Sequence, residues 1–336
     1  MRITRFLFPI LLIAMMMANG CSFLKEKAYT PTEAEKKLIA FCLNEGKLNV
    51  IVKRLGLTLW IYAPVQDPIF DVKASPGKEK AERKVQPLAL LSLQAEFSEK
   101  YFKLNYDVVP DVLAPEPTTY GSTYNEAYTK KRQLMYQALQ ESFFNAKDAP
   151  KDPAPEFVVI MITDVTRGIA TKSTVYLKDL RQYVSEVLPP DEYYMREANE
   201  IIGKEALIQD KLGKNVPYEE ITWPYFLTEQ IKTRIKYKFN NSDLPNDTVP
   251  ATEIAKAAAN TLRFYPFKDY TGVLIYDVRS KKELELTKDL LKGYAEKSTW
   301  ENEDRKLTTI HFQLPKDPTE GVVVNSVITT DGKQPQ

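Results

Sequence analysis

The stretch at residues 157–163 restricts the fold of this chain more than any other. Its seven residues, Phe-Val-Val-Ile-Met-Ile-Thr, are almost all apolar and lie between Pro155 and Asp164. A short apolar run that a proline precedes and a polar residue ends fits a buried strand better than a helix. Residues 272–276 have the same character and end at Asp277. The sequence therefore predicts a sheet with buried central strands.

The remaining patterns place helices around this sheet. Thr32 and Glu35 have the spacing of a capping box, which marks the start of a helix. Helices are predicted at residues 33–44, 48–55, 124–146, 177–187, 191–202, 224–239 and 252–264, the last one capped by Thr252. Strands are predicted at residues 57–63, 88–97, 101–109, 157–163, 171–176, 272–276 and 307–314. The predicted fold class is α+β, with a mixed or antiparallel sheet packed by helices.

Two parts of the chain share one order of elements. In each, a helix precedes an apolar strand that ends in an aspartate, Asp164 or Asp277, and a Lys-Asp-Leu triplet follows. The triplets contain Asp179 and Asp289, which lie 15 and 12 residues after the first aspartate. This predicts two related helix–strand modules, at residues 118–188 and 250–296. Chance similarity between two amphipathic units is the alternative.

The N-terminus has the features of an export signal. Arg2 and Arg5 precede an uncharged apolar run at residues 6–17, and Ala18-Asn19-Gly20-Cys21 follow. The run is shorter than the about 20 residues of a membrane-spanning helix. A charged start, a short apolar segment and small residues before a cut site are typical of secretory signals. An ordinary cleaved signal followed by a chance cysteine is one interpretation.

Residues 18–21 resemble the lipobox of bacterial lipoproteins. Gly20 before Cys21 fits the pattern, whereas Ala18 stands where leucine is commonest and Asn19 is less usual. The resemblance implies cleavage before Cys21, a diacylglycerol on its thiol and, in many bacteria, an acylated amine. Two or more acyl chains give a stable membrane anchor. Ser22, rather than aspartate, favours the outer membrane, facing the periplasm, if the source is Gram-negative.

The predicted export divides the chain into five parts. They are a signal peptide at 1–20, a lipidated tether at 21–31, an N-terminal α+β part at 32–117, a main α+β part at 118–316 and a polar tail at 317–336. Without Arg2 and Arg5 the chain has 44 basic and 45 acidic side chains, and no stretch is strongly basic. This balance argues against nucleic-acid binding.

Candidate site residues are few. Asp164 and Asp277 each end an apolar strand, where loops of α/β proteins often hold metals or phosphates. The alternative is that each aspartate stops its strand and caps a turn. Cys42 lies among apolar residues and fits the core, and His311 is the one histidine. Neither a zinc-ligand set nor a histidine-based triad can be built from these residues.

Other functional signals are weak. The sequence contains no Gly-x-Ser-x-Gly, no glycine-rich phosphate loop and no His-Glu-x-x-His. Aromatic clusters at residues 193–194, 223–226 and 265–270 could contact a ligand, although core packing is the simpler interpretation. Carboxylates near aromatics, such as Glu192 and the pair Glu219-Glu220, leave sugar cleavage open.

The anchor and the missing catalytic motifs favour a non-catalytic binding or structural role in an envelope assembly. The predicted partners are the membrane, through lipid on Cys21, and another envelope protein. We predict no cofactor, no metal site and no catalytic residue. The alternatives are a carboxylate-dependent envelope hydrolase and a sugar- or lipid-binding module.

Overall fold

A computed structural model describes residues 30–74, 85–113, 120–144, 154–241, 244–245 and 247–296. The predictions for the signal peptide, for Cys21, for the strand at 307–314 with His311, and for the tail at 317–336 lie outside these residues. The described residues form an α+β fold with three sheets, as the sequence predicted.

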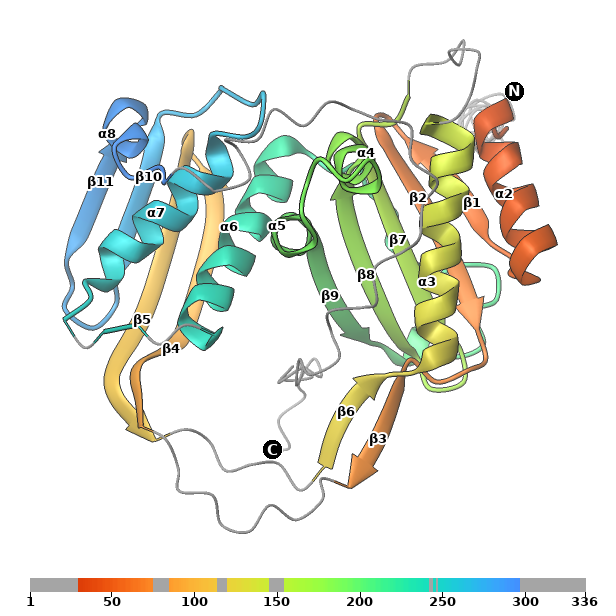
Figure 1. Cartoon of the computed structure of the whole chain (residues 1–336), viewed down its shortest axis with the longest axis horizontal. Coiled ribbons are helices and arrows are strands. Elements are labelled where there is room, and N and C mark those ends of the chain that lie inside the picture. Colours follow the sequence, from red (N-terminus) through yellow and green to blue (C-terminus); the bar gives the residue numbers. More distant parts are fainter. Residues whose placement is uncertain are drawn as a thin grey trace, which may run out of the picture.

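The first sheet has five strands in the order β1-β2-β7-β8-β9 (Figure 1). The strands are β1 (Ile51–Leu55), β2 (Thr58–Val65), β7 (Phe157–Asp164), β8 (Ile169–Tyr176) and β9 (Ala198–Gly203). The central strands β2 and β7 pair in parallel, with Ile61 opposite Ile160, and the other neighbours pair antiparallel. All eight residues of β7 are buried. The predicted strand at 157–163 is thus the buried centre of this sheet.

The second sheet has four strands in the order β11-β10-β5-β4. The strands are β4 (Val85–Ser98), β5 (Tyr101–Leu113), β10 (Gly272–Asp277) and β11 (Glu283–Thr287). Here too the central pair, β5 and β10, is parallel, and the outer pairs are antiparallel. The predicted hairpin of residues 88–97 and 101–109 is therefore confirmed as β4 and β5.

The two sheets are interleaved along the chain. Each draws its first hairpin from the N-terminal part and its other strands from beyond residue 117, so strands on both sides of the predicted boundary pair in each sheet. A third, two-stranded sheet of β3 (Phe70–Ala74) and β6 (Tyr120–Tyr124) projects below the first sheet in Figure 1. The chain therefore crosses between the sheets several times.

Helices cover one face of the first sheet. They are α2 (Glu33–Gly46), α3 (Glu126–Leu139), which continues as a π-helical turn (Gln140–Phe144), and α4 (Leu177–Val184). Leu38 of α2, Met135 of α3 and Leu180 of α4 pack in one cluster with Ile61 and Ile160. Thr32 caps α2 and Glu35 completes the capping box. This local signal was correctly identified from the sequence.

The opposite face of the first sheet shares a core with the second sheet. The elements between them are α5 (Pro190–Arg196), a 3-10 turn (Glu205–Leu207), α6 (Trp223–Asn241) and α7 (Pro250–Leu262); α8 (Lys288–Lys292) follows β11. Met161 of β7, Phe226 of α6, Ile254 of α7, and Phe102 and Val273 of the second sheet belong to one buried cluster. One core therefore joins the two sheets through α6 and α7 (Figure 1).

The residues that suggested an internal repeat occupy matching places in the two sheets. Asp164 and Asp277 end β7 and β10, the strands that pair in parallel with the first hairpin. Asp179 and Asp289 lie in the first turn of α4 and α8, the helices that directly follow β8 and β11. These matches support the predicted relation between the two modules, which stays a prediction.

Several predicted elements are wrong in type or extent. Residues 48–55 were expected to be helical, but β1 lies there, and the alternating burial of Leu48, Val50 and Val52 has the period of a strand. The predicted helix at 191–202 ends at Arg196, and β9 takes the rest because it pairs with β8. The helix expected to be capped by Thr252 begins earlier, at Pro250.

Candidate functional site

The two aspartates predicted as weak site candidates lie on different sheets. Asp164 is buried at the end of β7, and its Oδ1 accepts hydrogen bonds from Thr166 and from the backbone N–H of Arg167. Asp277 ends β10, and its oxygens accept from the N–H groups of Arg279 and Ser280 and from the Ser280 hydroxyl. In both places the carboxylate closes the turn of a hairpin.

A cavity lies elsewhere, at the seam between the two sheets and their helices. Its volume is about 450 Å³. On the first-sheet side it is lined by the end of β8 and by α4 and α5, and on the other side by the residues that follow α7. Its lining residues are Tyr176, Lys178, Asp179, Gln182, Arg196, Phe264, Tyr265 and Pro266. We call this the seam cavity.

Local structure explains how α4 contributes to the seam cavity. Gln182 follows Lys178 by four residues and Asp179 by three on this helix, so its side chain neighbours both of theirs. Asp179 is 4% exposed, Gln182 is half-buried and Lys178 is exposed. The helix therefore gives the cavity a buried carboxylate at its floor and two polar side chains nearer its rim.

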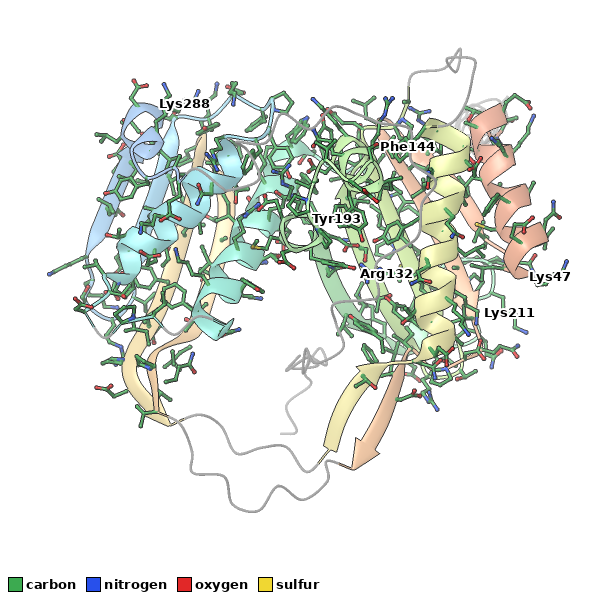
Figure 2. All side chains as sticks on the ribbon, in the orientation of Figure 1. Lys47, Arg132, Phe144, Tyr193, Lys211 and Lys288 are labelled. Atoms are coloured by element: carbon green, nitrogen blue, oxygen red, sulfur yellow. The ribbon has the colours of Figure 1, made fainter. Side chains whose placement is uncertain are left out.

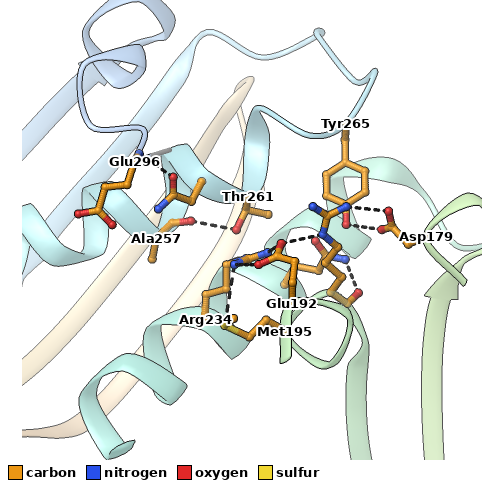
Figure 3. A network of polar contacts seen from close by, with 11 residues as sticks. Asp179, Glu192, Met195, Arg234, Ala257, Thr261, Tyr265 and Glu296 are labelled. Carbon is orange, nitrogen blue, oxygen red and sulfur yellow. Dashed lines mark hydrogen bonds and ion pairs between the residues drawn. The ribbon is translucent and has the colours of Figure 1, made fainter. Parts of the chain in front are cut away.

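The floor is a hydrogen-bonded group of three buried side chains. Arg196 Nη1 donates to Asp179 Oδ1 at 2.9 Å, and the Tyr265 hydroxyl donates to Asp179 Oδ2 at 2.6 Å. Arg196 is 3% exposed and Tyr265 is 2% exposed. Figure 3 shows Tyr265 pointing at Asp179 across the seam. These bonds fix the floor because each group is both buried and directionally held.

The ion pairs continue behind the floor. Arg196 Nε donates to Glu192 Oε1 at 2.8 Å, and the guanidinium of Arg234 on α6 binds the same carboxylate (Figure 3). Gln230 of α6 donates to the backbone carbonyl of Arg196. The network of Asp179, Glu192, Arg196 and Arg234 holds two negative and two positive charges. It ties α4 and α5 to α6.

A second ion pair adjoins this network. Glu197, which follows Arg196 directly, is fully buried; its Oε2 accepts from Arg132 of α3 at 2.6 Å and its Oε1 from the Tyr136 hydroxyl at 2.6 Å. Tyr193 of α5 packs edge-on against Tyr136. Figure 2 shows Tyr193 near α5 at the centre of the molecule and Arg132 beside α3. The consecutive residues Arg196 and Glu197 thus bind partners on different helices, Asp179 on α4 and Arg132 on α3.

Burial raises the pKa values of the carboxylates at the seam, whereas the neighbouring arginines lower them. Burial raises the pKa of Asp179 above its ordinary value, against the opposing effects of Arg196 and Tyr265. Burial also opposes ionisation of Glu192, but Arg234 and Arg196 outweigh it, and the pKa of Glu192 is lowered. The pKa of Glu197 is lowered because Arg132 and Tyr136 outweigh its burial.

Aromatic rings form the walls of the seam cavity. The Arg196 guanidinium lies over the Phe264 ring at 4.1 Å, which is close enough for a cation–π contact. Tyr176 meets Tyr265 edge-on at 5.8 Å and Trp223 at 5.0 Å. Because these rings pack on each other, the cavity is already formed in the free protein.

Three residues of this site stand out in the sequence, but nothing in the sequence shows that they lie together. Asp179 belongs to the predicted repeat, Glu192 is a carboxylate near aromatic residues, and Tyr265 lies in an aromatic cluster. Arg196 and Arg234 do not stand out, because nothing local in the sequence shows that they bind carboxylates 17 and 42 positions away, those of Asp179 and Glu192. Cys42 is fully buried, and burial raises the pKa of its thiol to about 11, which suits a core residue.

The described residues contain no group of three or more His, Cys, Asp or Glu side chains that could hold a metal ion. Among them, no helix has both the length and the apolar character needed to cross a membrane. Comparisons with protein-family models, with curated proteins and with solved structures return no match for this chain. Function must therefore be argued from the geometry of the site.

Proposed function

We propose that this chain is a lipid-anchored protein of the cell envelope that binds a partner or ligand and does not catalyse a reaction. The anchor rests on the lipobox-like residues 18–21. The non-catalytic role rests on one observation: among the described residues a single carboxylate, that of Asp179, lines the seam cavity, and both its oxygens accept hydrogen bonds, from Arg196 and from Tyr265. A group held in this way suits recognition more than proton transfer.

The alternative function is a carboxylate-dependent hydrolase. The opposite pKa shifts of Asp179 and Glu192 favour it, because acid and base partners in such enzymes are separated in this way. Sugar cleavage, however, needs two carboxylates that both reach the substrate. Arg196 binds both side chains here, and Asp179 is the one that lines the cavity. The geometry therefore supports binding better than hydrolysis.

Fractionation of cells that express the tagged full-length protein tests the anchor. We expect the natural protein to be processed and to sediment with membranes, and Cys21→Ala to block lipidation and lose this association. Ser22→Ala is the matched control, since it leaves the thiol in place. Membrane association that survives Cys21→Ala would contradict the proposal.

Cross-linking in the intact envelope tests the assembly role. We expect the anchored protein to give a reproducible adduct with one envelope protein. Asp179→Asn separates binding from catalysis, because an enzyme that uses this carboxylate would lose hydrolysis of envelope glycans. Glycan hydrolysis by the natural protein that Asp179→Asn abolishes would establish the alternative.

A further inference from the structure

The seam cavity has the construction of a ligand site. It lies between the two sheets and their helices, and its walls are aromatic. Its volume falls within the roughly 300–1,000 Å³ of small-molecule pockets. Three of its polar side chains, Asp179, Arg196 and Tyr265, are more than nine-tenths buried and bonded to one another. A ligand would meet a rigid surface and would order few side chains on binding.

The charge of the floor argues against an anionic ligand. The two arginines of the network are matched by Asp179 and Glu192. A phosphate or carboxylate beside Arg196 would add a buried negative charge next to Asp179 and Glu192 with no further cation to match it. Lys178 could attract an anion, but it is exposed at the rim, where solvent and salt weaken such pairs.

The polar lining argues equally against an acyl chain. A hydrocarbon would cover the amide of Gln182 and the hydroxyl of Tyr176 without forming hydrogen bonds, and buried polar groups left in that state are costly. A ligand that fits must be uncharged, must carry groups that both donate and accept, and must offer a flat apolar face to Tyr176, because guanidinium groups of Arg196 and Arg263 already lie over the Phe264 ring. A pyranose ring meets all three requirements.

We infer that the seam cavity binds one or two neutral pyranose rings of an envelope glycan. The inference rests on the proposed envelope function, because export brings the cavity to the compartment where such glycans occur. Gln182 would exchange hydrogen bonds with ring hydroxyl or acetamido groups, and one ring face would lie against Tyr176. Asp179 and Arg196 would hold the floor without taking part in a reaction.

Isothermal titration of the full-length, detergent-extracted protein tests this inference. The probes are di-N-acetylchitobiose and cellobiose, which share a backbone and differ in the acetamido group, with inorganic phosphate as the charged comparison. We expect saturable binding of at least one disaccharide to one site and none of phosphate. Gln182→Ala and Tyr176→Phe should each weaken binding about threefold, and together about tenfold, which is the size of one or two hydrogen bonds.

Gln94→Ala is the matched control, because Gln94 is an exposed glutamine on β4 in the other sheet; it should leave the affinity unchanged. The inference is overturned if neither disaccharide saturates at about 10 mM, a concentration that fills even a weak site. It also fails if phosphate binds instead, or if Gln182→Ala and Gln94→Ala behave alike. Fractionation of Cys21→Ala reports on the anchor independently, so the two proposals can fail separately.

Discussion

In both main sheets a hairpin pairs in parallel with a later hairpin, and β9 extends the first sheet alone; the surroundings of the two sheets differ. Helices pack on both faces of the first sheet, and every residue of β7 is buried. In β5 of the second sheet burial alternates, with Phe102, Leu104, Tyr106 and Val108 turned toward the helices. The same arrangement of paired strands thus gives a strand buried on both faces in the first sheet and a strand buried on one face in the second.

The difference extends to the charges. Ion pairs beside the first sheet are buried: Arg196 binds Asp179 where α4, α5 and α6 meet, and Glu197 binds Arg132 of α3. Ion pairs on the second sheet, such as Arg279 with Asp107, are exposed. Only the first kind can fix the position of helices strongly, because solvent screens the second.

Arg196→Ala should have the largest effect on stability. It leaves Asp179 without its guanidinium and Glu192 with Arg234 alone, so we expect the free energy of unfolding to fall by about 3–5 kcal/mol. Arg279→Ala, on the second sheet, should cost less than about 1 kcal/mol. Urea unfolding at pH 7 measures both. Equal losses would show that the charges of the two sheets do not differ as described.

Core truncations should separate the faces of the two sheets. Ile160 and Met161 lie on opposite faces of β7 and are both buried, so each change to alanine should cost about 2–5 kcal/mol. On β10, Ile275→Ala should cost as much, whereas the half-buried Leu274, on the other face, should cost about 1 kcal/mol. Thermal unfolding of the four variants measures this. A large loss for Leu274→Ala would mean that something covers that face.

Acid should weaken the seam in a defined direction. The pKa values of Glu192 and Glu197 are lowered, so the stability that these residues contribute is present above their ordinary value of 4.5 and is lost as the pH falls through the folded-state values. The raised pKa of Asp179 acts with the opposite sign, since its contribution is present below 3.8 and is lost as the pH rises. Acidification removes the contributions of two carboxylates, Glu192 and Glu197, and restores that of one, Asp179. We therefore expect the free energy of unfolding to fall below pH 4.5.

Glu197→Gln isolates one of these groups. The variant should be less stable than the natural protein at pH 7, and its unfolding free energy should decline less steeply on acidification, because one titrating carboxylate is gone. Urea unfolding between pH 7 and about pH 3 gives both slopes. An unchanged slope would remove Glu197 from the explanation of acid sensitivity.

The smallest effect is expected at a hairpin turn. Glu99 and Lys100 join β4 and β5 with φ angles of 53° and 63°, whereas Gly56 supplies the positive φ of 54° in the β1–β2 turn of the first sheet. Asn-Gly is preferred where both central residues have positive φ. Glu99→Asn with Lys100→Gly should therefore raise the unfolding free energy by about 0.5–1 kcal/mol. A loss of stability would show that the native side chains matter more than the backbone.

The sequence predicts those features of the fold that depend on interactions between neighbouring residues. The cap of α2 by Thr32 and the buried strand at residues 157–163 depend on neighbouring residues, and both are confirmed. β9 exists because it pairs with β8, and its sequence, Ala-Asn-Glu-Ile-Ile-Gly, does not show this. β1 carried an alternating pattern that was misassigned to a helix.

The candidate site was harder to predict for the same reason. Asp179, Arg196, Arg234 and Tyr265 come from four separate segments, and the interleaved order of the two modules brings them together. Asp164 and Asp277, by contrast, are conspicuous in the sequence because each follows an apolar run. The structure places both in local turns, away from the seam cavity.

Hydrogen exchange of the full-length protein, with and without di-N-acetylchitobiose, tests the central claim that the seam is a built binding site. Amides of α4 and of the segment after α7 should exchange more slowly with the disaccharide present, while those of β4 and β11 should not change. Slower exchange on both sides of the seam is the predicted result. Unchanged exchange at the seam, or protection confined to the second sheet, would contradict the claim.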